Sequence, residues 1–149
     1  MPIAIRNSKI FITSEKLTKE LAKEFTKYLN GGEFVFLYGE IGVGKTTFVK
    51  FFINELQTLN SLPKTEITSP TFNLLNEYQL KDLRIKHYDL FRISRKEDIK
   101  NLDIFEKDNK LITFIEWPKL LTDTHNIKSI DLTFSYLNDL NDRSVEIKI

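Results

Sequence analysis

The sequence predicts an α/β domain of three layers, built on a mainly parallel β-sheet to which antiparallel strands are added at one edge. Residues 34–38 are a continuous apolar run of strand length, as expected for a strand buried on both faces of a parallel sheet, and residues 111–115 (LITFI) predict a second strongly apolar strand. Segments with apolar residues at helical spacing alternate with β-like runs along the chain, which is the order typical of α/β proteins.

The first half of the chain predicts strand, helix, strand and helix in turn. Residues 9–13 form a short strand candidate. Ser14 is suited to cap a helix whose apolar residues share one face, and the Gly-Gly pair at 31–32 ends that helix. The strand at 34–38 then leads into a glycine-rich loop and a helix at 45–59.

The second half begins with a polar loop at 60–70. The elements predicted after it are β-like segments at 72–80 and 84–91, a helical segment at 95–106, the strand at 111–115 and alternating strands at 129–137 and 143–149. No linker or internal repeat divides them, so we expect residues 1–149 to form a single domain.

Composition excludes several classes of protein. The chain has no cysteine, which excludes disulfides, thiolate metal sites and cysteine nucleophiles and favours a reducing cytoplasm. A formal net charge of +1 does not support a protein that grips nucleic acid through its overall field, so any RNA contact is expected to be local or made by a partner. No segment approaches the roughly 20 apolar residues of a membrane span and no signal peptide is recognisable, so we expect a cytoplasmic protein.

The glycine-rich loop at residues 39–47 carries the strongest functional signal. From Gly39 to Thr46 it reads GEIGVGKT, which fits the pattern G-x-x-x-x-G-K-[ST] without a mismatch, between a buried strand and an amphipathic helix. Glycines let backbone N–H groups point inward and form a nest for phosphate oxygens. We expect Lys45 to contact the β- and γ-phosphates, Thr46 a Mg²⁺ ion and Thr47 the α-phosphate. The context disfavours a glycine-rich turn that binds nothing, and it predicts a P-loop NTPase-like domain that binds ATP with Mg²⁺.

Two carboxylates follow predicted strands and are candidates to complete the site, since a P-loop needs a carboxylate that holds Mg²⁺ or positions water. Glu116 ends the strand at 111–115, where a parallel strand delivers a side chain to the ligand edge of the sheet. This position favours function over an ordinary surface carboxylate. Asp89 lies in the segment at 84–91, where functional and structural roles are about equally supported.

Three further features have simple structural interpretations. Ser69 and Thr71 flank a proline in a loop that could sense the γ-phosphate, but alone they favour a plain Ser-Pro turn. Trp117 is by default a core or rim aromatic, although its position allows stacking near the nucleotide. His87 and His125 are interpreted as structural, because no second histidine stands at metal-ligand spacing.

Among P-loop proteins, a GTPase is excluded on details of the sequence. The guanine motif Asn-Lys-x-Asp is absent, since Asn109-Lys110 is followed by Leu111-Ile112, and no glycine follows Asp89 at the usual switch position. A nucleoside or nucleotide kinase would need an arginine-rich lid, and the chain has few arginines. A small ATPase or an ATP-dependent switch remains.

Five blocks stand in order along the chain: LYGEIGVGKTTF at 37–48, TSPTFNL at 68–74, NEY at 76–78, HYDLFR at 87–92 and IEWP at 115–118. Together they resemble the TsaE family, the P-loop ATPases of bacterial tRNA threonylcarbamoyladenosine biosynthesis, over essentially the whole chain. The P-loop block is generic, whereas the Ser-Pro-Thr, His-x-Asp-Leu-x-Arg and Glu-Trp-Pro blocks are specific in combination.

The resemblance implies a weak, Mg²⁺-dependent ATPase that works with the TsaD–TsaB heterodimer. In this scheme TsaD transfers the threonylcarbamoyl group, ATP hydrolysis resets the complex, and the chain meets tRNA only through its partners. By position, the resemblance implies Thr46 and Glu116 as Mg²⁺ ligands, Asp89 as support for the metal or the attacking water, and Ser69 and Thr71 as a switch. The implied nucleotide-binding residues are Glu15, Gly39, Glu40, Gly42, Val43, Gly44, Lys45, Thr46, Thr47 and Arg143, and the implied catalytic residues are Lys45, Asp89 and Glu116.

Two other functions stay open from the sequence. One is a free-standing small-molecule P-loop kinase, which would phosphorylate a nucleoside or a sugar. The other is a nucleotide-gated binding module without meaningful turnover.

Overall fold

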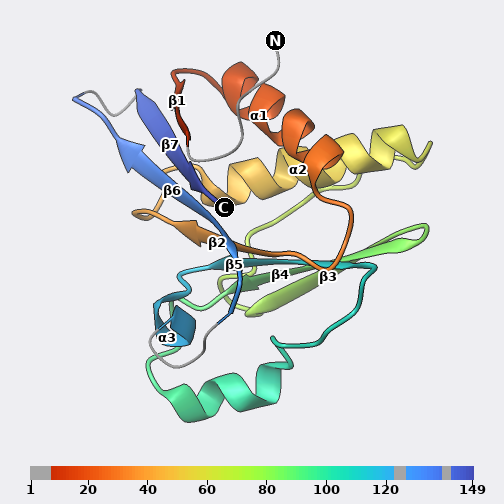
Figure 1. Ribbon diagram of the computed structural model, residues 1–149, viewed down its shortest axis with the longest axis vertical. Coiled ribbons are helices and arrows are strands. Elements are labelled where there is room, and N and C mark those ends of the chain that lie inside the picture. The colour runs from red at the N-terminus through yellow and green to blue at the C-terminus, as the bar shows by residue number, and fades with distance from the viewer. Residues whose placement is uncertain (1–7, 123–126, 139–141) are drawn as a thin grey trace.

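The computed structural model describes residues 8–122, 127–138 and 142–149, which form a seven-stranded sheet with helices on both faces (Figure 1). In order across the sheet, the strands are β1 (Ser8–Ile12), β7 (Arg143–Lys148), β6 (Ile130–Tyr136), β2 (Phe34–Tyr38), β5 (Leu111–Glu116), β4 (Leu83–Asp89) and β3 (Leu75–Leu80). The helices are α1 (Glu15–Tyr28), α2 (Lys45–Leu59), the 3-10 helix η1 (Lys96–Leu102) and the short α3 (Lys119–Thr122).

The central strands β6, β2, β5 and β4 are parallel, and antiparallel strands extend the sheet at both edges. At one edge β3 pairs with β4, and at the other β7 pairs with β6 and β1 with β7. The predicted combination of a parallel core and added antiparallel strands is therefore confirmed. The expectation that the antiparallel strands lie at one edge only is wrong. The outermost strands of the parallel core are β4 and β6, and each of them forms a hairpin with an antiparallel strand, β3 or β7.

Helices α1 and α2 cover one face of the sheet, and η1 and α3 lie on the other (Figure 1). On the first face, the buried ring of Phe48 in α2 meets Phe25, Phe114 and Phe134 edge-on, at centroid distances of 5.4, 6.4 and 6.1 Å. Such aromatic contacts hold α2, and the loop that precedes it, against the sheet. On the second face, Ile99 of η1 belongs to a smaller core beneath β4 and β5.

Most predicted elements occur with small shifts at their ends. Ser14 caps α1 as predicted, since its side chain accepts a hydrogen bond from the Leu17 N–H at 3.4 Å. The strand expected from residue 72 begins only at β3, because Leu74 has a φ of 66°, outside the range of extended backbone. The helix expected at 95–106 is the shorter 3-10 helix η1, and α3, which follows Pro118, has no counterpart among the predicted elements.

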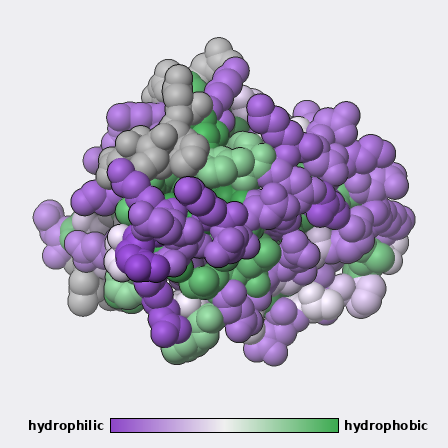
Figure 2. Space-filling view, turned by 90° about the horizontal axis from the view of Figure 1, so that it is seen from below, coloured by the Kyte–Doolittle hydropathy of each residue, from purple (hydrophilic) through white to green (hydrophobic). Residues whose placement is uncertain are grey.

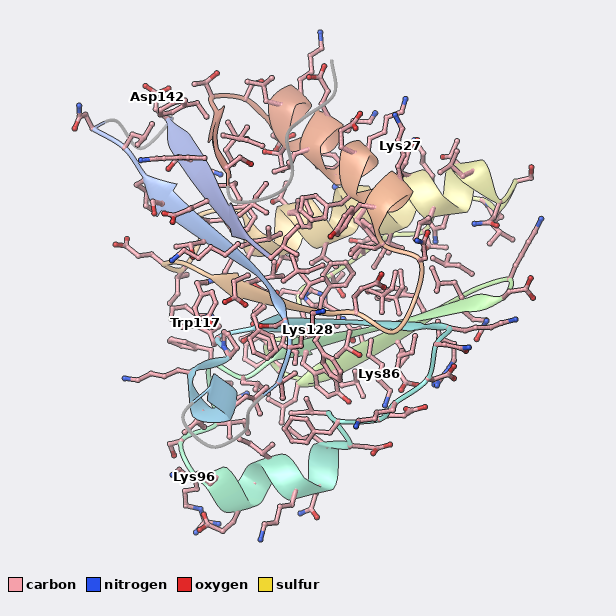
Figure 3. The ribbon with its side chains drawn as sticks, viewed as in Figure 1. Lys27, Lys86, Lys96, Trp117, Lys128 and Asp142 are labelled. Carbon is pink, nitrogen blue, oxygen red and sulfur yellow. The ribbon has the colours of Figure 1, made fainter. Side chains whose placement is uncertain are left out.

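The carboxyl ends of the parallel strands β2, β5 and β4 lie side by side, along one end of the sheet. Their register places Leu37 beside Glu116, and Glu116 beside Asp89. Figure 3 shows Trp117 at this end of the sheet, close to α3, and Lys86 on the η1 side. Because ligands of open α/β sheets bind outside the carboxyl ends of parallel strands, this end is where a site is expected.

The surface over η1 and α3 is mainly hydrophilic and is broken by small hydrophobic areas (Figure 2). Within the described ranges, no helix is long and apolar enough to cross a membrane.

Candidate functional site

The loop between β2 and α2 adopts a conformation that requires glycine. Gly39, Gly42 and Gly44 have φ angles of 141°, 78° and 119°, in a region that residues with a Cβ rarely adopt. A Cβ on Gly39 would also lie 2.7 Å from the Phe134 carbonyl oxygen and 2.8 Å from Val43 Cγ1. The result is a concave loop that closes directly onto the N-terminus of α2, where the helix dipole favours an anion.

Lys45, the first residue of α2, has its ammonium folded back into this loop. Nζ donates to the carbonyl oxygens of Gly39 and, at 3.3 Å, Glu40, and it lies 3.9 Å from the centroid of the Trp117 ring. Burial lowers the pKa of Lys45, and the carboxylates of Glu116 and Asp89 act in the opposite direction. The charge is therefore held at the mouth of the loop by groups that surround it on several sides.

The Glu116 carboxylate links three elements. Its Oε2 accepts a hydrogen bond from the Thr46 hydroxyl of α2 at 2.9 Å and lies 2.6 Å from His87 Nε2 of β4. Glu116 itself, at the end of β5, is only 3% exposed. Since a buried carboxylate must be hydrogen-bonded or paired, these contacts account for its stable position.

Asp89, at the end of β4, is tied to the loop that carries the hydroxyls. Its Oδ2 accepts from Thr71 Oγ1 at 2.9 Å, its Oδ1 accepts from the Phe91 N–H at 3.0 Å, and the hydroxyls of Ser69 and Thr71 lie 2.6 Å apart. The same loop is anchored by buried Ile67. Ser69 and Thr71 are thus held beside a carboxylate rather than directed only to solvent.

Trp117 follows Glu116 with a φ of 59°, which is rare for a bulky residue and costs about 1–3 kcal/mol. The backbone N–H of Trp117 donates to the Leu37 carbonyl oxygen at 3.3 Å, and the centroid of its ring lies 4.9 Å from that of the Phe91 ring. This conformation turns the indole under the Lys45 ammonium, where it forms a wall of the site.

The two loops and the strand ends enclose one small cavity of about 180 Å³. It is lined by Ile41, Gly42, Lys45, Thr46, Ser69, Thr71, Asp89, Phe91, Glu116 and Trp117. The residues expected to hold the metal, to act in catalysis and to form the switch therefore lie together.

Other predicted residues lie in a second cavity, of about 340 Å³, on another side of the loop. Glu15, Gly44, Thr47 and Arg143 contribute to its lining. Arg143 Nη1 donates to the Val43 carbonyl oxygen at 3.3 Å. Glu15 and Arg143 thus do not reach the cavity of Lys45, but they border the same loop from the side of α1 and β7.

A larger cavity, of about 930 Å³, lies at the opposite end of the strands, where β2 and β6 begin. The acidic side chains that line it are already engaged: Glu33 accepts from the Asn30 and Gly31 N–H groups, and Asp108 from Lys110 N–H and Arg84. We therefore place the candidate site at the smaller cavity, where charged groups converge.

Sequence reasoning did not assign a functional role to His87, which the structure brings into contact with Glu116. Period-two alternation puts residues 87 and 89 on one face of β4, so the functional candidate Asp89 could have drawn attention to it. His125 lies outside the described residues.

Comparisons with known proteins show the family to which the chain belongs. The family model described as "Threonylcarbamoyl adenosine biosynthesis protein TsaE" matches residues 12–145. The tRNA threonylcarbamoyladenosine biosynthesis protein TsaE of Rickettsia bellii is 35% identical over 137 residues, which cover 89% of this chain and 90% of the relative. The protein of the same name from Rickettsia typhi is 36% identical over 92% of both chains, and that from Aquifex aeolicus is 35% identical over 72% of this chain and 74% of its own.

Among solved structures, the crystal structure of Bacillus subtilis YdiB superposes with a TM-score of 0.70 at 21% identity, over 94% of this chain and 83% of that one. This likeness supports the fold, whereas the match to the family model runs from the end of β1 into β7 and spans every loop of the candidate site. The chain therefore belongs to the TsaE family of tRNA threonylcarbamoyladenosine biosynthesis proteins.

Proposed function

We propose that this chain is an ATP-binding, Mg²⁺-dependent ATPase of low turnover that acts on a TsaD–TsaB complex during tRNA threonylcarbamoyladenosine synthesis. The observation that carries the proposal is the convergence of Lys45, Thr46, Asp89 and Glu116 on one cavity beside the glycine-rich loop.

The loop fits a triphosphate. Its glycines have the positive φ angles that a nest of inward-pointing N–H groups needs, and the adjoining N-terminus of α2 adds a partial positive charge. Lys45 supplies a full positive charge, which among the described residues contacts loop carbonyl oxygens and an aromatic ring face. Phosphate oxygens can replace those carbonyl oxygens as acceptors of its N–H groups.

The donor set beside the loop fits Mg²⁺. Thr46 and Glu116 contribute hydroxyl and carboxylate oxygens, the type of ligand that Mg²⁺ prefers. A bound Mg²⁺ would neutralise negative charge on the phosphates. We assign Thr46 and Glu116 to the metal, directly or through its water, and Asp89 to support of the metal or the attacking water.

Ser69 and Thr71 are proposed as the element that responds to the nucleotide. Their hydroxyls lie at the cavity and already form a chain to Asp89, so a γ-phosphate at this position would compete for the same hydrogens. This connection supports a switch that responds to the state of the nucleotide.

The partner assignment rests on the family. A net charge of +1 does not support direct binding of tRNA through the overall charge of the chain. The proposal is therefore that the chain meets tRNA through TsaD–TsaB. Group transfer is then carried out by the partner, and hydrolysis of ATP by this chain resets the complex.

The decisive experiment combines hydrolysis and association. The purified chain should hydrolyse ATP slowly with Mg²⁺ and should be retained by an immobilised TsaD–TsaB heterodimer when ATP is present. No retention with ATP would overturn the partner assignment. Labelled ATP incubated with a panel of nucleosides and sugars tests the competing kinase function, since any phosphorylated acceptor would favour it.

A further inference from the structure

His87 and Thr46 share one oxygen of Glu116. The imidazole is fully buried, and its Nε2 lies 2.6 Å from Glu116 Oε2, to which the Thr46 hydroxyl donates at 2.9 Å. Both side-chain hydrogen bonds that Glu116 makes with described residues therefore end on Oε2. The other carboxylate oxygen, Oε1, is the one left for a metal ion or for its water.

The chemistry of the pair assigns the hydrogen atom between them. A carboxylate can only accept, so His87 Nε2 is the donor. Nδ1 of the same ring is buried and has no hydrogen-bond partner among the described residues. The contact between Nε2 and Glu116 is therefore the side-chain hydrogen bond that the ring makes with described residues.

We propose that His87 is a positioning residue that holds the Glu116 carboxylate toward Thr46 and thereby sets the Mg²⁺ affinity of the site. This inference rests on the proposed function, because it takes Mg²⁺ as the ion that Glu116 serves. His87 does not itself line the cavity that contains Lys45 and Thr46, so it acts through Glu116 and not on the nucleotide.

We expect loss of the His87 hydrogen bond to weaken Mg²⁺ binding, because this hydrogen bond restricts the orientation of the Glu116 carboxylate. Without the His87 N–H, the Glu116 side chain would keep, among the described residues, the hydrogen bond from Thr46 alone and could leave the orientation that a metal needs. Hydrogen-bond partners of metal-ligating carboxylates typically change metal affinity about 10- to 100-fold when they are removed. Binding of nucleotide without metal depends on the loop and on Lys45, and it should not change.

The test uses two substitutions at His87 and a matched control. His87→Leu removes the donor, and His87→Gln retains an N–H near the position of Nε2. Tyr88→Phe removes the hydroxyl of the next residue of β4, a buried side chain on the opposite face of the sheet that donates to the Leu102 carbonyl oxygen at 2.6 Å. All variants are compared at a temperature at which circular dichroism shows them folded.

Binding of a fluorescent ATP analogue is measured in EDTA and over a series of Mg²⁺ concentrations, and Mn²⁺ binding is followed by electron paramagnetic resonance. We expect His87→Leu to raise the Mg²⁺ concentration at half-saturation and the Mn²⁺ dissociation constant at least about tenfold, with unchanged affinity in EDTA. His87→Gln should recover most of this loss, and Tyr88→Phe should match the unmodified chain.

Two outcomes overturn the assignment of His87. One is an unchanged metal requirement in His87→Leu, and the other is an equal loss in EDTA and in Mg²⁺. If the unmodified chain binds no ATP analogue under any condition, the proposed function itself fails, and this result is distinguishable from both.

Discussion

Lys45 and Glu116 carry opposite charges at almost fully buried positions, and neighbouring groups hold each of them in place. The lysine is held by loop carbonyls and by the face of Trp117, and the glutamate by Thr46 and His87. Both side chains are thus ordered before any ligand arrives, which reduces the entropy that binding must overcome. Their roles should nevertheless separate, because the proposed function assigns Lys45 to the phosphates and Glu116 to the metal.

Replacement of Glu116 by alanine tests this separation. We expect ATP hydrolysis to fall at least about 100-fold, since the variant loses the carboxylate assigned to Mg²⁺, while binding of ATP in EDTA is retained. Steady-state phosphate release and binding of a fluorescent ATP analogue measure the two effects. Glu97→Ala, at an exposed carboxylate of η1, is the control. Unchanged turnover in Glu116→Ala would refute the metal assignment.

At the scale of elements, α2 fixes the relation between the glycine-rich loop and the sheet. The helix is attached through aromatic packing, in which Phe48 contacts rings from α1, β5 and β6. The connection from η1 to β5 is held against β4 by ion pairs instead. Glu106 receives hydrogen bonds from Lys86 at 2.7 Å and from Arg84, both on β4.

Phe48→Ala should lower the free energy of unfolding by about 3–5 kcal/mol, because it removes a buried ring and leaves a cavity among its aromatic neighbours. Phe72→Ala is the matched control, since Phe72 is 82% exposed, and its effect should stay within about 0.5 kcal/mol. Urea unfolding followed by circular dichroism gives both values. Equal destabilisation by the two substitutions would contradict the role given to Phe48.

The Glu106 contacts predict a dependence of stability on pH. Hydrogen bonds from Lys86 and then Arg84 hold the pKa of Glu106 below its usual range. A carboxyl group whose pKa is lower in the folded chain stabilises the fold above its unfolded pKa, about 4.3, and loses this effect as pH falls through the folded value. Glu106→Gln should therefore lower the Tm at pH 7, and the difference from the unmodified chain should narrow below about pH 4. A difference that is constant from pH 7 to pH 3 would exclude this origin.

At the scale of the whole molecule, the sequence predicted the features that depend on local patterns but not those that depend on contacts between distant segments. The strand, loop and helix around Lys45 were predictable because glycine spacing and apolar periodicity are local. The pairing of β1 with β7 was not, because it joins the two ends of the described chain. The left-handed backbone of Trp117 and the contact between His87 and Glu116 likewise depend on the register of β4, β5 and β2, which no short segment specifies.

Because the cavity is assembled from segments that are distant in sequence, it exists only in the folded chain, and a ligand bound there should stabilise the entire fold. At a ligand concentration 100 times the dissociation constant the gain is about 2.7 kcal/mol, which raises the Tm of a chain of this length by roughly 5–10 °C. We expect this shift with ATP and Mg²⁺ in differential scanning fluorimetry, and a smaller one with GTP, whose base has no recognition motif in the sequence.

Lys45→Ala should abolish most of the shift, because it removes the positive charge that faces the loop, whereas Lys50→Ala should preserve it. Lys50 lies on the same helix with its side chain exposed, so this pair separates a local phosphate contact from a general effect of charge on α2. A full shift in Lys45→Ala would mean that ATP binds elsewhere on the molecule, and the cavity at the ends of β2, β4 and β5 would lose its assignment.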